Sequence, residues 1–234
     1  MIKLYFKNKP KHNLIMKIFY YYDEPYEDMK ENFENSFKDD FKKNVIKLET
    51  FKTSVVGNDL KNPVSRGKKR TTGGGLDSWL FKTGMVIDAI SNNFGEVIVI
   101  SDIDIVFYDK CIPTILKTIE NVDISFQREN PRRNVNIGFI AIRCNDTTLN
   151  FWKTVRQVCM DNNTWDQKVV NQLLYKDKYP IKWNRFPPRI WCRTQRKLPK
   201  NIILHHANLA GTKAKKYNQF KKVASLIKKR KDEK

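Results

Sequence analysis

The apolar positions of this chain follow two periods that alternate along the sequence. Runs rich in β-branched and aromatic residues predict strands at 14–22, 45–48, 97–100, 122–126, 135–142, 181–183 and 202–205. Helical spacing predicts helices at 77–90, 113–120, 147–160 and 165–175, and it also places Phe33, Phe37 and Phe41 on one core-packing stripe. Strands that alternate with helices are typical of the α/β class, so we expect a mixed sheet wrapped by helices.

The run from Val97 to Ile100 has the composition of a strand buried on both faces, as in the middle of a parallel sheet. Asp102 and Asp104 follow it, and because side chains alternate along a strand, both should point to the same side. Open α/β sheets bind ligands at this edge. Two carboxylates this close raise each other's pKa unless a cation lies between them, which favours Mg²⁺ or Mn²⁺. The alternative is that they only end the strand by accepting hydrogen bonds in a turn.

Size and composition indicate a single domain, which we assign to residues 1–216. The chain has 234 residues, 40% of them hydrophobic, enough for one sizeable core. No apolar run approaches the roughly 20 residues of a membrane-spanning helix, and the N-terminus lacks the apolar stretch of a signal peptide, so we expect a soluble, cytoplasmic protein. The four cysteines are scattered without a Cys-x-x-Cys pair, which favours buried free thiols over zinc or disulfides.

A formal net charge of +20 implies a polyanionic partner or a tolerance of one. Much of the excess lies in two segments, residues 57–75 and residues 213–234. We interpret 57–75 as a flexible basic loop, either a lid or disordered. Within the second segment we assign 217–234 to a basic C-terminal tail. The simplest interpretation is a solvated, mobile segment, and the alternatives are contact with nucleic acid or peripheral contact with an anionic membrane surface.

Two polar segments lie on other predicted elements. In the strand at 135–142, Asn136 offers both a donor and an acceptor, and Gly138 permits close approach of the backbone to a ligand. The alternative for this pair is a strand entry with a structural glycine. Asp166 and Gln167 open the helix at 165–175, where they are candidates for ligand contact, although an aspartate at this place often serves only as a helix cap.

The last predicted strand delivers two of the three histidines in the chain, His205 and His206, to its end beside Asn208. A histidine at a strand terminus can supply a metal ligand. The sequence continues with Gly211 and a group of lysines suited to hold a diphosphate, namely Lys213, Lys215 and Lys216.

Taken in order, five of these segments resemble the pattern of the nucleotide-diphospho-sugar transferases of the GT-A fold, which include retaining α-glycosyltransferases. The matching segments are Lys82, Ser101-Asp102-Ile103-Asp104, Asn136-Ile137-Gly138, Asp166-Gln167 with Asn171, and His206-Ala207-Asn208 with Gly211 and Lys213. The resemblance covers roughly residues 14 to 216. It implies a single GT-A-like (Rossmann-like) domain with a mixed, mostly parallel central sheet flanked by helices.

The same resemblance implies a glycosyltransferase that moves a sugar from a UDP- or GDP-sugar, with UDP favoured and with retention, to a glycan or protein acceptor. The implied cofactor is Mn²⁺ or Mg²⁺, held by Asp102, Asp104 and His206. His206 is preferred to His205 because of its spacing to the residues that follow. The residues implied to bind the nucleotide sugar are Tyr21, Tyr22, Lys82, Asp102, Asn208, Gly211 and Lys213. Those implied to act on the transferring sugar or the acceptor are Asp166, Gln167 and Asn136.

Two other classes of protein share parts of the pattern. The segment from Val99 to Val106 also resembles the strand and Asp-x-Asp motif of haloacid-dehalogenase-type phosphatases and phosphotransferases. That family carries the motif on its first strand, whereas here two predicted strands precede it. A basic nucleic-acid-binding protein is the non-enzymatic alternative, but no recognised groove-reading motif is present and the basic residues cluster in segments expected to be flexible, so nucleic acid is disfavoured.

Overall fold

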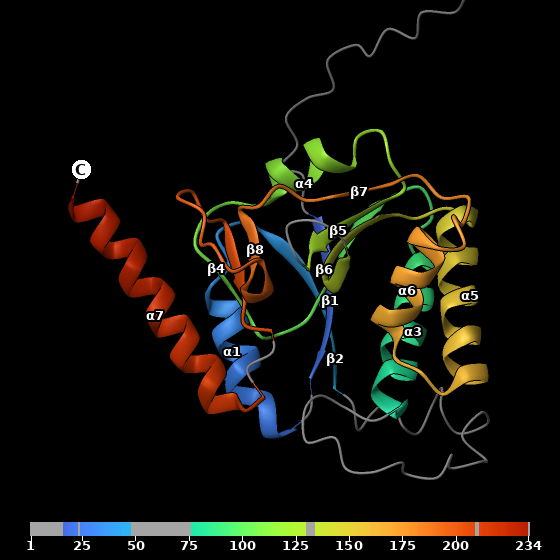
Figure 1. Cartoon of the computed structure of the whole chain (residues 1–234), viewed down its shortest axis with the longest axis horizontal. Coiled ribbons are helices and arrows are strands. Elements are labelled where there is room, and N and C mark those ends of the chain that lie inside the picture. The colour runs from blue at the N-terminus through green and yellow to red at the C-terminus, as the bar shows by residue number, and fades with distance from the viewer. Residues whose placement is uncertain (1–15, 23, 48–75, 130–133, 209–210, 234) are drawn as a thin grey trace, which may run out of the picture.

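The structure, a computed structural model, describes residues 16–22, 24–47, 76–129, 134–208 and 211–233. The basic segment 57–75 lies outside the described residues, so its interpretation as a loop or lid stays a prediction. A six-stranded sheet in the order β2-β1-β3-β6-β5-β7 forms the centre of the described part (Figure 1). Its strands are β1 (Met16–Tyr22), β2 (Phe41–Lys47), β3 (Val97–Ser101), β5 (Ile124–Arg128), β6 (Val135–Arg143) and β7 (Trp183–Arg185).

Five of these strands run in one direction and β6 runs against them. β1 is parallel to β2 and β3, β6 is antiparallel to β3 and β5, and β7 is parallel to β5. The expected mixed, mostly parallel sheet is confirmed. Ile98, Val99 and Ile100 of β3 are fully buried, because strands flank β3 on both edges and other elements cover both of its faces. The C-terminal end of β3, where the two aspartates follow, therefore lies in the middle of the sheet and not at its outer strands.

Helices and a small second sheet cover the two faces of the central sheet. α3 (Leu76–Ser91), α5 (Asp146–Asn162) and α6 (Asp166–Tyr175) pack on one face and share a core with it. The other face carries α1 (Glu27–Asn35), α4 (Ile112–Ile119) and a three-stranded sheet. That sheet has the order β4-β9-β8 and consists of β4 (Ile105–Phe107), β9 (Leu204–His206) and β8 (Ile190–Cys192).

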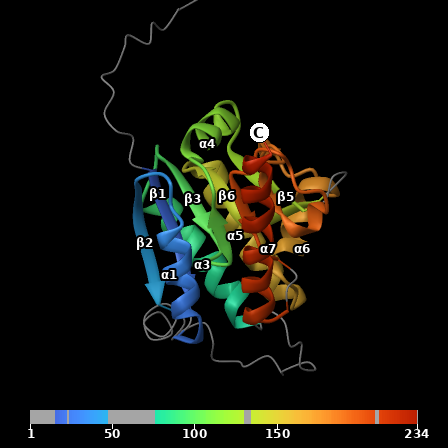
Figure 2. The ribbon, with the colours of Figure 1, turned by 90° about the vertical axis from the view of Figure 1, so that its left-hand side faces the viewer.

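The C-terminal basic segment is a long helix rather than an irregular mobile tail. α7 (Lys213–Asp232) lies outside the small sheet and next to α1 (Figure 2). Phe220, Val223 and Ile227 follow a helical spacing; Val223 and Ile227 pack against Trp191 of the small sheet, which explains why this charged sequence folds. The outer side of α7 is solvated, as expected for a basic segment. Its exposed basic residues include Lys215, Lys221, Lys222, Lys228 and Lys229.

The phenylalanine stripe is a core feature, as expected, but it is not one helix. α1, which follows a short 3-10 helix at Glu24–Tyr26, ends at Asn35, and Phe41 begins β2. The chain turns at Ser36, whose hydroxyl donates to the carbonyl of Phe33. The rings stay in contact through this turn, with centroid distances of 4.9 Å between Phe33 and Phe37 and 5.2 Å between Phe37 and Phe41. The periodic spacing therefore correctly identified three core residues but wrongly placed them on one helix.

The strand expected at 45–48 is β2, which begins four residues earlier at Phe41, and the other expected elements agree within two residues at the ends that the structure describes. The pattern missed the three-residue strands β4 and β8 and the 3-10 helices Glu24–Tyr26 and Arg193–Gln195, which are too short to show a period. It also did not predict the helix α7. All four cysteines are buried with free thiols, as expected. Among the helices that the structure describes, none is both long enough and apolar enough to cross a bilayer.

Candidate active site

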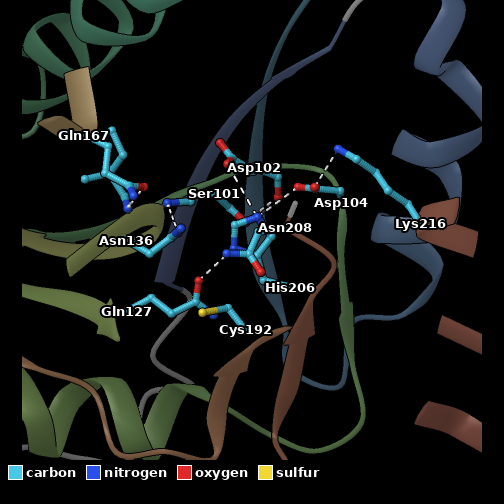
Figure 3. Close-up of polar contacts among 12 residues, drawn as sticks. Ser101, Asp102, Asp104, Gln127, Asn136, Gln167, Cys192, His206, Asn208 and Lys216 are labelled. Atoms are coloured by element: carbon cyan, nitrogen blue, oxygen red, sulfur yellow. Dashed lines mark hydrogen bonds and ion pairs between the residues drawn. The ribbon is translucent and has the colours of Figure 1, made fainter. Parts of the chain in front are cut away.

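Asp102 and Asp104 lie in a short connection between β3 and β4 and not on a strand, because β3 ends at Ser101. They nevertheless converge on one histidine (Figure 3). Asp102 Oδ2 is 3.8 Å and Asp104 Oδ1 is 3.2 Å from His206 Nε2. Two backbone contacts explain this: the Asp102 amide donates to the carbonyl of Gly138, and β4 pairs Ile105 directly with His206.

Each carboxylate divides its two oxygens between a lysine and this histidine. Lys82 Nζ of α3 lies 2.6 Å from Asp102 Oδ1, and Lys216 Nζ of α7 lies 2.7 Å from Asp104 Oδ2. Burial lowers the pKa of Lys82, but the nearby carboxylates, Asp102 foremost, outweigh burial and raise it. Burial likewise raises the pKa of Asp104, but His206 and Lys216 outweigh it and hold that pKa far below its usual range. Lys82 and Asp104 therefore both carry their charge.

His206 is held by a fourth residue on the side away from the carboxylates. Its Nδ1 lies 2.8 Å from Oε1 of Gln127, and because a carbonyl oxygen can only accept, this contact is a hydrogen bond when Nδ1 carries a hydrogen. In the neutral tautomer with that hydrogen on Nδ1, the ring has its Nε2 lone pair toward the two carboxylate oxygens. These three ligand atoms lie within 4.8 Å of one another. Two carboxylates and a neutral imidazole are a donor set that fits Mn²⁺ or Mg²⁺.

Gly138 makes room for this arrangement. A Cβ at this position would collide with the His206 ring and would lie 2.7 Å from Asp102 Oδ2. The pairing of β5 with β6 shifts here, since Phe126 pairs with Ile140 whereas Gln127 pairs with Asn136. The bulged backbone of β6 thus approaches the site closely, as β-bulges beside active sites often do. Gly138 therefore lets the backbone lie against the His206 ring and Asp102, and the close approach to a ligand stays a prediction.

Asp166 and Gln167 begin α6 on the other side of the site. The N-cap residue is Trp165, so Asp166 is the first helical residue, and its Oδ1 accepts from the Gln167 amide at 2.8 Å. Asp166 is only 5% exposed, and its Oδ2 has no hydrogen-bond partner among the described residues. Burial raises the pKa of Asp166, and Lys82 opposes that rise. A buried carboxylate oxygen without a partner goes beyond what a helix cap requires.

Asn136 uses both its donor and its acceptor within the protein. Its amide donates to Glu129 Oε2 at 2.6 Å and accepts from the Gly138 amide at 2.8 Å, which holds the bulge of β6. Gln167 supports the next residue of the bulge, where its Oε1 accepts from the Ile137 amide at 3.4 Å. Asn171 fixes the start of the same strand through two bonds to Val135. These contacts link α6 to the edge of the sheet that carries the carboxylates.

Two of the predicted residues beyond β9 lie apart from the carboxylates. Lys213 Nζ binds Asp28 Oδ1 at 2.9 Å and the Pro25 carbonyl at 3.0 Å, next to α1. Gly211 is exposed and has a φ of 72°, a conformation that favours glycine. Asn208, in contrast, lies beside His206 (Figure 3), and its amide donates to the Thr194 hydroxyl.

The tyrosines at the end of β1 point to alternate faces. Tyr20 is buried and donates to Glu34, on the α1 side of the sheet. Tyr21 packs against Phe81 of α3 with a ring distance of 4.9 Å, and the Tyr22 ring lies 5.5 Å from the Lys30 ammonium. Tyr21 and Tyr22 therefore leave the first strand on different sides.

The sequence alone did not identify Gln127 or single out Lys216. Gln127 lies one residue beyond the predicted strand 122–126, and the structure extends that strand as β5 to Arg128. Lys216 was one of three neighbouring lysines, and the choice among them depends on the rotation of α7, which its basic sequence does not reveal.

Comparison with known proteins agrees with this geometry. The sequence model of the nucleotide-diphospho-sugar transferase family matches residues 83–220, more than half of the chain. The fold is similar to that of a glycosyltransferase involved in the glycosylation of the major capsid of PBCV-1, with a TM-score of 0.58, 13% identity, and coverage of 87% of this chain and 98% of that one. It is also similar to the galactosyltransferase LgtC in complex with donor and acceptor sugar analogues, with a TM-score of 0.52, 12% identity, and coverage of 82% and 87%. No curated protein sequence matches significantly.

Proposed function

The chain belongs to the nucleotide-diphospho-sugar transferase family, and we propose that it transfers the sugar of a UDP-sugar, or less favourably a GDP-sugar, to a glycan or protein acceptor with retention. Membership of this family places the Asp-x-Asp motif in a glycosyltransferase and not in a haloacid-dehalogenase-type phosphatase. The observation that carries the proposal is the convergence of Asp102 Oδ2, Asp104 Oδ1 and His206 Nε2 within 4.8 Å.

We assign Asp102, Asp104 and His206 to hold Mn²⁺ or Mg²⁺. When bound, such an ion stabilises the negative charge that develops on a departing nucleoside diphosphate. Lys82 and Lys216 supply further positive charge, because both ammonium groups already lie against the two carboxylates and can turn to the diphosphate. Lys213, whose ammonium contacts the exposed Asp28, also remains a candidate for contact with the diphosphate.

We assign the sugar to the start of α6. The unpartnered Oδ2 of Asp166 is suited to accept from a sugar hydroxyl or to stabilise positive charge at the anomeric carbon, and Gln167 lies next to it. Asn136 keeps the bulge of β6 in place beside this position. Tyr21 and Tyr22 remain candidates for stacking on the base, and Asn208 and Gly211 remain candidates for contact with the diphosphate.

A screen of nucleotide sugars tests the proposal. Hydrolysis or transfer should appear with a UDP-sugar and Mn²⁺, should vanish with a chelator, and should give a product of the same anomeric configuration as the donor when followed by NMR. UDP should raise the melting temperature only when metal is present, since the metal links the protein to the diphosphate. Equal stabilisation without metal would instead indicate a site made by the lysines alone.

Asp166→Asn tests the assignment of the sugar. Asparagine caps helices about as well as aspartate, so a capping role predicts little change. A role at the sugar predicts a loss of kcat of about 100-fold or more, with UDP affinity nearly unchanged. Asp146→Asn is the matched control, because Asp146 is the first residue of α5 just as Asp166 is of α6, but it is exposed. Normal turnover of Asp166→Asn would remove this residue from the catalytic set.

A further inference from the structure

Gln127 is a fully buried polar residue near the end of β5. Ile124 and Phe126 of β5 face the core shared with α3, α5 and α6, so Gln127 faces the opposite side of the sheet, toward β9. It is 0% exposed, and its Oε1 contacts His206 Nδ1 at 2.8 Å (Figure 3). Its Nε2 has no hydrogen-bond partner among the described residues.

Packing alone does not account for an amide at this position. A buried amide nitrogen without a partner costs about 1–3 kcal/mol. Leucine has a similar volume and would fill the same place without that cost. The single contact that glutamine adds among the described residues is the acceptor for His206, so the oxygen of Gln127 is the feature to explain.

That oxygen decides which nitrogen of His206 is available to a metal. A neutral imidazole has one N–H, and the hydrogen bond made by one ring nitrogen determines the state of the other. When a neutral ring donates Nδ1–H to Gln127, its Nε2 lone pair faces Asp102 and Asp104. In the other tautomer Nε2–H would donate to Asp104 Oδ1, which lies 3.2 Å away, and no lone pair would face the two carboxylates.

We propose that Gln127 is a positioning residue, which fixes the tautomer and the ring orientation of His206 so that Nε2 can bind the metal. The proposal rests on the proposed function, because it requires that His206 is a metal ligand. The shift in pairing between Phe126 and Gln127 supports it: the bulge brings Gly138 against the His206 ring, so glutamine and glycine hold the ring from two sides.

Two substitutions at Gln127 separate this role from packing. Gln127→Leu keeps the volume and removes the acceptor, whereas Gln127→Glu keeps an acceptor oxygen for Nδ1–H. A positioning role predicts that Leu weakens Mn²⁺ binding about 10- to 100-fold and that Glu stays within about threefold of the native protein or binds more tightly. A packing role predicts the reverse order, because a buried carboxylate is costlier than a buried leucine.

The measurement is a titration of each full-length variant with Mn²⁺, followed by water proton relaxation with and without UDP, so that no turnover is needed. Gln195→Leu is the control, since Gln195 is also buried but bonds to Ile190 and Cys192 rather than to His206. It should bind Mn²⁺ as the native protein does. Circular dichroism and melting temperatures establish that each variant is folded.

A second measurement needs no variant of Gln127. In the ¹⁵N spectrum of the native protein with Mg²⁺ and UDP, the ring proton of His206 should reside on Nδ1. A proton on Nε2, or native-like Mn²⁺ affinity in Gln127→Leu, would overturn the role of Gln127 and leave the proposed function standing. Failure of the native protein to bind Mn²⁺ in either condition would overturn both.

Discussion

β9 presents two neighbouring histidines to two different environments. His206 faces the central sheet, where Gln127, Asp102 and Asp104 surround its ring with polar groups. His205 faces α7, where its ring packs between Trp191 at 4.9 Å and Phe220 at 5.5 Å. Gln219 of α7 interacts with this ring electrostatically, yet neither ring nitrogen makes a hydrogen bond within the described residues.

The difference between the two rings follows from the strand, not from the residue type. His205 is 0% exposed and His206 is 3% exposed, so burial does not separate the histidine that faces the carboxylates from the one that packs against aromatic rings. The alternation of side chains along β9 separates the two histidines. The pairing of Ile105 with His206 turns the His206 ring toward the connection that carries the two aspartates. The same amino acid thus faces two carboxylates on one side of the strand and packs against aromatic rings on the other.

The largest effect should come from removing a carboxylate that His206 faces. Asp104→Asn keeps the shape of the side chain but weakens the metal site and leaves Lys216 without its ion pair. We expect transfer to fall at least about 100-fold while the protein stays folded. Asp109→Asn serves as control, because Asp109 is an exposed aspartate shortly after β4. If Asp104→Asn turned over about as fast as the control, the polar groups around His206 would not be needed for transfer.

An identical substitution at the two histidines should separate them next. His206→Leu should abolish the rise in melting temperature that UDP and Mn²⁺ produce together, which at 100-fold saturation is worth about 2.7 kcal/mol. His205→Leu should retain that rise to within about 1 °C, because this ring faces away from the site. Thermal unfolding of both variants with UDP, with and without Mn²⁺, measures the difference. The opposite order would make His205 the ligand.

The smallest effect concerns the pH dependence of stability. Burial, with a smaller contribution from the adjacent His206, lowers the pKa of His205 from its ordinary 6.5 to about 3. Between these values the unfolded chain binds a proton that the folded protein excludes, so this contribution is complete above pH 6.5 and is lost as the pH falls toward 3.

Native protein should therefore lose stability faster than His205→Leu in this window, by up to about 1.4 kcal/mol per pH unit. The other charged groups that act on this ring, Asp104 and Arg193, are the same in both proteins, so the difference isolates His205. Urea denaturation of the metal-free proteins at several pH values measures it. Parallel curves would mean that the ring is accessible to protons in the folded state.

The elements of this fold were predictable where the signal is local. The β-branched run of β3 revealed the central strand, and the helical spacing of α3 revealed the helix that carries Lys82. Strands of three residues such as β4 have no period to detect, although β4 is what aligns Asp104 with His206.

The composition of the site was predictable, but its internal contacts were not. The two aspartates and one histidine could be selected because their chemistry suits a metal. The choice of Lys216 over Lys213 depends on how α7 is rotated about its axis, and the contact of Gln127 with His206 joins positions 79 residues apart. Both contacts join residues that are far apart in the sequence, so no pattern within one segment predicts them.

The contacts around the carboxylates also imply an order of assembly during synthesis. The Lys82–Asp102 contact spans 20 positions, the Gln127–His206 contact spans 79, and the Lys216–Asp104 contact spans 112. Closing longer loops costs more entropy, and a partner that lies later in the sequence leaves the ribosome later. A nascent chain that ends before β9 therefore carries both aspartates and only one of their lysines, and it lacks His206. The three groups proposed to hold the ion can therefore meet only after β9 has been synthesised.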